Sequence, residues 1–268
     1  MAPGRSWPQR FVVACLLPLA LLAGCGSSPK DDDKGSAEKL YAEARDDMSA
    51  GSYDRAIKTL ERVEGRAAGT LLAQQASLDL AYSYWKTGER AQALSTIDRF
   101  IKLHPSSPAL DYALYLKGLV NFNDNLGLLS AISRQDLSER DQQASRDAYQ
   151  AFRQLVEQFP NSRYSADARL RMDYIVNALA EYELHVARYY YRRGAYVAAA
   201  NRAQQAIRDY QQTPSVEEAL YIMALSYDKL GLTDLRDDAD RVLKKNYPDS
   251  SFLREGFRRR DDPWWKLW

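Results

Sequence analysis

The balance of apolar and polar residues changes sharply near residue 25. Residues 11–23 are apolar, broken only by one proline, and they follow Arg5 and Arg10 with no acidic residue before them. A basic start and an apolar run too short to span a bilayer predict a cleaved secretory leader over residues 1–24. Residues 25–36 hold no large apolar side chain and cannot bury enough surface to order themselves, which predicts a flexible linker.

Cys25 lies at the junction of these two stretches. The sequence Leu-Ala-Gly-Cys that ends there resembles the bacterial lipoprotein box, whose cysteine is acylated and becomes the first residue of the mature chain. That resemblance implies lipid attachment, palmitate included, at Cys25; the alternative is an incidental cysteine in an ordinary signal peptide. Gly26 follows in place of the aspartate that retains lipoproteins in the inner membrane. The resemblance therefore implies a protein anchored in the cell outer membrane on its periplasmic face.

Beyond the linker, the sequence repeats itself. Residues 81–88 and 224–231 both read A-x-S-Y-x-K-x-G, and a proline follows each final glycine by seventeen residues. The pattern resembles the tetratricopeptide repeat, a helix-turn-helix unit with small residues where its two helices cross. Aligning the turn glycines gives four units, which begin at residues 37, 74, 180 and 217, and a fifth begins at 111 with Gly118 in the place of the small residue at the helix crossing.

We therefore expect an all-α fold, a solenoid of five helical hairpins with about ten helices. A generic helical bundle is the alternative. Residues 123–145 form an expected insertion in the third repeat, and residues 166–179 lengthen the first helix of the fourth. The expected segments are repeats one to three at 37–160, repeats four and five at 161–250, and an aromatic and basic tail at 251–268.

Aromatic residues gather on the first helices of the first three repeats. In the tetratricopeptide family these helices line the binding surface, so the resemblance makes the aromatic residues candidates for binding an extended peptide. Packing between helices is the competing interpretation of an aromatic stripe at helical spacing. The cargo-binding candidates are Tyr41, Tyr82, Trp85, Tyr112, Tyr115 and Phe122.

The fourth repeat is rich in arginine. Between residues 163 and 208 there are eight arginines and four acidic residues, with three consecutive tyrosines at 189–191. Arginine and tyrosine are enriched at protein interfaces, which indicates a docking surface, while a solvated basic face is the alternative.

Residues 159–172 and 182–202 resemble the BamD family, lipoproteins of the outer-membrane β-barrel assembly machinery. The resemblance implies a scaffold that binds unfolded outer-membrane proteins with its first half and docks on the barrel subunit BamA with its second. It also implies contact with the other lipoproteins of the complex. The docking candidates that it suggests are Arg188, Tyr189, Arg192, Arg193, Asn201 and Arg202. A pilotin-like lipoprotein that escorts a secretin shares the anchor and the repeats and is the alternative.

Composition argues against several other classes of function. The formal net charge is +1, and removal of residues 1–24 takes away two arginines and no acid to give −1, so nucleic acid is not an expected partner. The only histidines are His104 and His185, and no metalloprotease, serine-hydrolase or phosphate-loop motif accompanies them. We expect no catalytic activity, cofactor or metal. The three tryptophans after residue 263 suit a membrane interface, a cap on the last repeat or a disordered tail.

Overall fold

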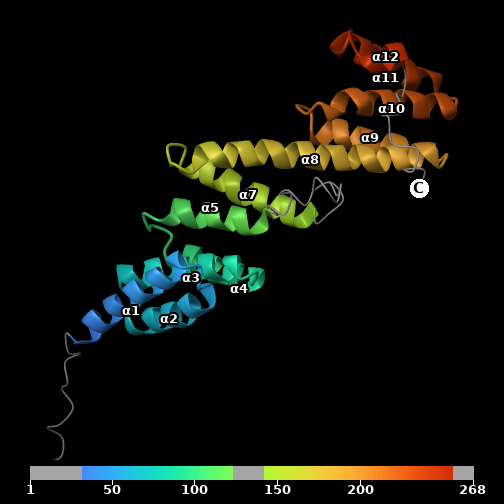
Figure 1. The fold of residues 1–268 in the computed structure, drawn as a ribbon. Coiled ribbons are helices and arrows are strands. Elements are labelled where there is room, and N and C mark those ends of the chain that lie inside the picture. The colour runs from blue at the N-terminus through green and yellow to red at the C-terminus, as the bar shows by residue number, and fades with distance from the viewer. Residues whose placement is uncertain (1–31, 123–141, 256–268) are drawn as a thin grey trace, which may run out of the picture. The chain divides into compact units, whose positions relative to one another are not determined.

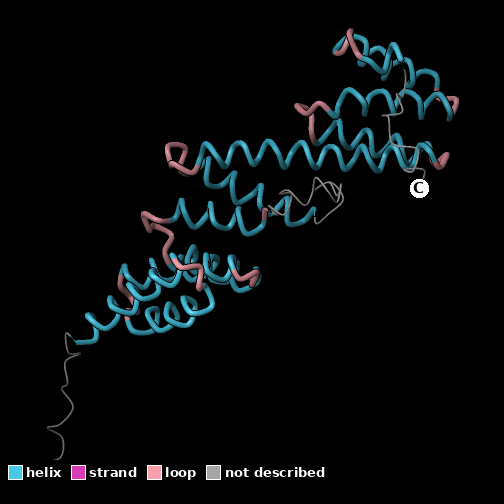
Figure 2. Tube along the Cα trace, in the orientation of Figure 1, coloured by secondary structure: helices cyan, strands magenta, loops and turns pink. Residues whose placement is uncertain are grey.

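The computed structural model describes residues 32–122 and 142–255, the first four by their backbone alone, and every regular element in these ranges is a helix (Figures 1 and 2). The all-α prediction is confirmed. The eleven described helices are α1 (Asp32–Ser49), α2 (Tyr53–Arg66), α3 (Leu71–Lys86), α4 (Arg90–Leu103), α5 (Leu110–Asn121), α7 (Gln142–Gln158), α8 (Ser165–Arg192), α9 (Tyr196–Asp209), α10 (Ser215–Lys229), α11 (Thr233–Asn246) and α12 (Ser251–Glu255). In the ranges described, no helix is long and apolar enough to cross a membrane.

The chain divides into two compact units, Met1–Ala76 and Ser77–Trp268. In the first unit α1 and α2 pair as a helical hairpin, with Ala44 and Ala56 fully buried where the two helices pack. Between them Gly51 has φ 74°, and its N–H donates to the Met48 carbonyl at 3.0 Å. That left-handed conformation ends α1 and requires glycine, because L side chains rarely adopt it.

Two predicted boundaries differ from the structure, and other predicted segments lie outside the described residues. Helix α1 begins at Asp32, so residues 32–36 of the expected linker are helical; extending an existing helix adds one hydrogen bond for each residue that is fixed. Helix α7 begins at Gln142, inside the expected insertion 123–145. Cys25 and residues 26–31, 123–141 and 256–268 lie outside the described residues.

In the second unit the hairpins are α3/α4, α5/α7, α8/α9 and α10/α11, so the five-hairpin prediction is confirmed. The turn glycines Gly88, Gly194 and Gly231 have φ between 72° and 84°, like Gly51, which fixes the repeat register. Four buried clusters join neighbouring hairpins, and each cluster shares a helix with the next. Helix α8 has 28 residues, about 42 Å of helix, and packs against α7, α9 and α10 (Figure 1). The predicted lengthening of the fourth repeat is therefore confirmed.

The described part of the C-terminal tail covers the last hairpin. The ring of Phe252 on α12 stacks on Tyr221 of α10 at 5.3 Å between centroids. Leu253 packs against the buried cluster of Val216, Leu220 and Leu243. Residues 251–255 therefore contact α10, whereas the three tryptophans lie outside the described residues and their interpretations stay predictions.

Two helices approach closely at Gly118 of α5. A Cβ atom placed there would lie 2.2 Å from the ring of Phe152 on α7, which is fully buried. This glycine occupies the crossing position that alanine holds in the other repeats. The missing methyl group makes room for the larger phenylalanine.

We expect Gly118→Ala to lower the free energy of unfolding by on the order of 1–3 kcal/mol, because overpacking outweighs the helix propensity of alanine. Urea denaturation followed by circular dichroism measures the change. Gly65→Ala is the matched control, since Gly65 is also helical and has open space around its Cβ position. Equal stability of the two variants would contradict the close packing.

Candidate functional site

Two of the predicted cargo-binding residues, Tyr82 and Trp85, form an aromatic pair on α3. Their rings meet edge to face at 5.7 Å, and both are half-buried against the cluster that joins α3, α4 and α5. The ammonium group of Lys86 lies 5.6 Å from the centroid of the Trp85 ring. Tyr41 lies on α1 in the other compact unit. The rings of Tyr82 and Trp85 therefore pack against the core and also present part of their surface to solvent.

The other predicted aromatics belong to a second group, in which α5 meets the N-terminal half of α8. The Tyr164 ring stacks on Tyr115 at 4.8 Å and lies 5.5 Å from Tyr112. Phe122, at the end of α5, contacts Tyr174 edge to face at 5.7 Å. All five residues belong to the second unit, and we call them the α5–α8 aromatic surface.

A polar cluster lies within this surface. The Tyr115 hydroxyl donates to Asp167 Oδ2 at 2.7 Å, and Arg171 Nε donates to the same oxygen at 2.6 Å. Burial and the hydrogen bond to Asp167 raise the pKa of Tyr115 to about 12. Burial opposes ionisation of Asp167, but the hydrogen bonds from Arg171 and Tyr115 outweigh it and lower its pKa. The Arg171 guanidinium also lies 5.0 Å from the Phe122 centroid, so it fixes both an acid and a ring.

Sequence reasoning missed the α8 side of this surface. Tyr164, Asp167, Arg171 and Tyr174 recur at spacings of three, four and three residues, which places them on one face of a helix. The alignment of the repeats assigned residues 166–179 to a lengthening of the first helix of the fourth repeat and predicted no binding surface there. Helical periodicity inside the extra residues was the signal that could have identified it.

The docking candidates lie around the turn from α8 to α9, and four of them are exposed. Tyr189, Arg192 and Arg193 lie at the end of α8, and Asn201 lies on α9. The Arg193 guanidinium lies 5.4 Å from the Tyr189 ring centroid. Exposed Val197 adds an apolar side chain to the same region. We call these residues the α8–α9 surface.

The other two docking candidates hold helices together. Arg188 donates Nε to Glu218 Oε1 and Nη2 to Glu218 Oε2, the latter at 2.6 Å, and it donates Nη1 to Glu181 at 2.8 Å. Burial acts against the charge of Arg188, but the two glutamates outweigh it and raise its pKa. Arg202 of α9 donates to Glu183 of α8 at 3.0 Å, and the Glu183 side chain is only 2% exposed. Arg202 therefore has a structural role, because its partner is buried.

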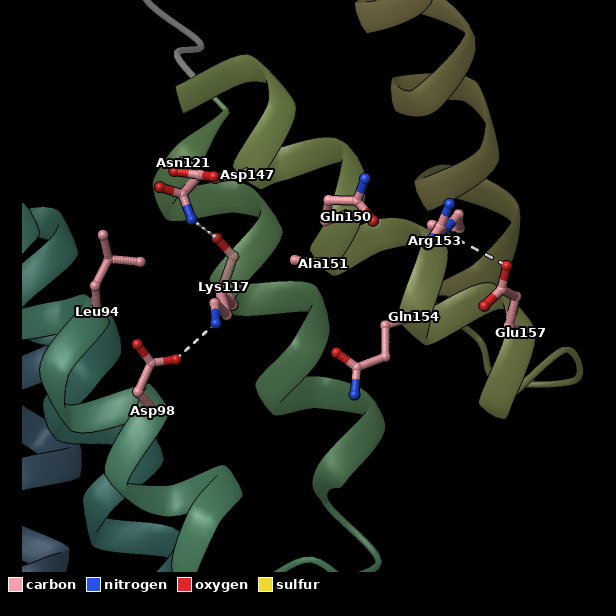
Figure 3. Close-up of a pocket in the computed structure, with 10 residues that line it drawn as sticks. All are labelled: Leu94, Asp98, Lys117, Asn121, Asp147, Gln150, Ala151, Arg153, Gln154 and Glu157. Carbon is pink, nitrogen blue, oxygen red and sulfur yellow. Dashed lines mark hydrogen bonds and ion pairs between the residues drawn. The ribbon is translucent and has the colours of Figure 1, made fainter. Parts of the chain in front are cut away.

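A cleft of about 540 Å³ opens between α4, α5 and α7 (Figure 3). Ion pairs cross it or line it: Lys117 Nζ lies 2.7 Å from Asp98 Oδ1, and Arg153 Nε lies 3.5 Å from Glu157 Oε1. None of the predicted binding residues lines it. Its charged groups form salt bridges, and it has no arrangement of nucleophile and base.

The described residues also contain no cluster of three histidine, cysteine or acidic side chains that could hold a metal ion. His104 ends α4 and packs against the Phe100 ring at 5.3 Å, and His185 is exposed on α8.

Comparison with known proteins decides the family. Residues 33–243 match the family model YfiO, described as an outer membrane lipoprotein. Outer membrane protein assembly factor BamD of Neisseria meningitidis serogroup B is 48% identical over 97% of this chain and 99% of its own length. The chain belongs to the BamD family of outer membrane lipoproteins.

More distant relatives carry the same name. BamD of Haemophilus influenzae is 37% identical over 87% of this chain and 89% of its own length, and BamD of Vibrio cholerae is 35% identical over 86% and 96%. Among solved structures, MamA protein aligns with 84% of this chain and 98% of its own at 16% identity, with a TM-score of 0.33.

In this BamD-family chain we expect Arg202→Ala to reduce the free energy of unfolding by on the order of 1–3 kcal/mol, because Glu183 would stay buried without its partner. Arg202 itself is more than one-third exposed, which keeps the figure below that of a fully buried pair. Thermal unfolding measures the loss. Arg192→Ala is the control and should change stability by less than about 0.5 kcal/mol. The double variant Glu183→Gln/Arg202→Ala should recover part of the lost stability. If Arg202→Ala and Arg192→Ala were equally stable, the Arg202–Glu183 ion pair would not contribute to the fold.

Proposed function

We propose that this protein is a non-enzymatic scaffold for the assembly of outer-membrane β-barrel proteins. It binds unfolded barrel proteins and docks on BamA, and it is held at the periplasmic face of the outer membrane by lipid on Cys25. The family supports the assembly role, since the curated relatives are named outer membrane protein assembly factors. A secretin-escorting pilotin is disfavoured by the same family membership. Affinity purification distinguishes the two roles, with BamA recovered in the first and a secretin in the second.

The observation that carries the cargo proposal is the set of half-exposed aromatic rings on α3, α5 and α8. A transmembrane β-strand alternates apolar and polar side chains and is rich in aromatics near the membrane interface. Before insertion, its apolar side chains face water. Aromatic rings offer large contact areas at low entropic cost and can cover alternate side chains of such a strand.

Arg171 adds a polar element to the α5–α8 aromatic surface. Its guanidinium is shared between Asp167 and the face of Phe122, and its side chain remains 22% exposed. An extended segment beside it would find both an apolar face and a hydrogen-bond donor. This combination suits an unfolded barrel strand better than it suits a uniformly apolar helix.

Docking on BamA is assigned to the α8–α9 surface. Tyr189 and Val197 are exposed large side chains, and Arg192 and Arg193 supply two positive charges that face solvent. Tyrosine and arginine together are the usual composition of the central contacts of an interface. Arg188 and Arg202 take part indirectly, by holding α10 and α9 against α8.

We expect Tyr82→Ala/Trp85→Ala to weaken binding of a C-terminal barrel-strand peptide about tenfold, since each aromatic contact contributes roughly 0.5–1.5 kcal/mol beyond burial of area. Fluorescence anisotropy with a labelled peptide measures affinity, and circular dichroism checks the helices of the same samples. Leu103→Ala, which removes an exposed apolar side chain from α4, is the matched control. Unchanged affinity in a folded double variant would reduce the α3 pair to core packing.

Charge reversal by Arg192→Glu/Arg193→Glu should weaken binding of the periplasmic domains of BamA tenfold or more, because both the charge and the Arg193–Tyr189 contact are lost. Surface plasmon resonance gives the affinity. Lys58→Glu/Arg62→Glu makes the same charge change on two exposed positions of α2 and should bind like wild type. If both double variants lose affinity equally, net charge rather than the α8–α9 surface governs the interaction.

A further inference from the structure

The last hairpin leaves one apolar flank open. Leu232 is 44% exposed, Leu235 46% and Val242 36%, and all three belong to α11 or the residue just before it. Leu235 and Val242 are seven residues apart and point in the same direction to within about 20°. Buried Leu243, which faces α10, lies about 80° further round the helix from Leu235. The flank is therefore next to the core of the hairpin.

In the preceding hairpins this flank is covered. The second helix of each packs against the first helix of the next, α4 against α5, α7 against α8 and α9 against α10. Helix α12 begins at Ser251, 36 residues after α10 begins at Ser215, so it occupies the position of a sixth first helix. It has only five residues and contacts the α10 side of the last hairpin through Phe252.

The sequence beyond α12 has the composition to cover the exposed flank of α11. Thirteen residues follow Glu255, and they include Phe257, Leu267 and three tryptophans, Trp264, Trp265 and Trp268. Extended, they reach up to about 45 Å, whereas α11 is about 21 Å long. Leu253 of α12 packs in the same cluster as Leu243, so the described chain ends in a helix that contacts α11.

We propose that residues 256–268 fold back along α11 and cover the flank formed by Leu232, Leu235 and Val242, with tryptophan rings packed on Leu235 and Val242. A solenoid exposes the core of its terminal repeat unless a cap covers it. Tryptophan is suited to this role because one ring buries 150–250 Å² or so of surface. The tail is thus the cap of the fifth repeat, and its tryptophans are turned toward protein rather than toward lipid.

Site-specific photo-crosslinking in intact outer membranes tests the location of the tail. A photoreactive phenylalanine analogue at Val242 should form intramolecular adducts that mass spectrometry maps to residues 256–268. The same analogue at Leu103, an exposed leucine at the end of α4 outside both proposed binding surfaces, is the matched control and should give no adducts to the tail. Adducts from position 242 to lipid or to another protein, or no adducts at all, would overturn the proposal.

Limited proteolysis of the full-length protein gives a second readout. Trypsin cleaves after arginine, and the tail offers Arg258, Arg259 and Arg260. The variant Leu235→Asp/Val242→Asp should release the tail and speed cleavage there at least tenfold, while Leu103→Asp should leave the rate unchanged. Both positions of the double variant are already partly exposed, so the helices should remain folded. Equal cleavage rates in a folded double variant would show that nothing covers the flank.

Discussion

The close approach of paired helices is the constraint on which this fold depends. At each crossing the chain places a small residue, Ala44, Ala81, Gly118, Ala187 or Ala224, and each of them is buried. Helix backbones can come this near only where side chains are absent or limited to one methyl group. At Gly118 the residue is smaller still, and the ring of Phe152 occupies the space where a Cβ would lie.

Helix α8 connects the two surfaces to which function is assigned. Its N-terminal half carries Asp167, Arg171 and Tyr174, and its C-terminal end carries Tyr189 and Arg192. Tyr174 and Tyr189 are fifteen residues apart, about 22 Å along one continuous helix. Buried Glu183 lies between them and holds Arg202, so the same stretch that separates the surfaces also fixes α9 in place. The lengthened helix thus sets the spacing of the two surfaces as well as completing a repeat.

The repeats could be predicted because their signal is local. A glycine with positive φ at each of four turns and a small residue at each of the five crossings recur at fixed offsets, and each reflects a steric demand met within one hairpin. The roles of the arginines could not be predicted in the same way. Arg188 and Arg192 share a helical face in the sequence, yet only Arg188 meets Glu218, which lies thirty residues away on α10. Which arginine is engaged depends on tertiary packing, and sequence spacing alone does not carry that information.

The same reasoning explains why the candidate binding aromatics are also packing residues. Rings such as Tyr115 and Tyr164 need support on one side to present a fixed face on the other, and mutual stacking supplies that support. The hydrogen bond from the Tyr115 hydroxyl to Asp167 also fixes the orientation of the Tyr115 ring, since it ties this residue of α5 to α8. A ring held in this way loses little conformational entropy when a strand is placed against it. Packing and binding are therefore compatible roles for one residue, and the half-buried state of these aromatics is what a preorganised binding surface requires.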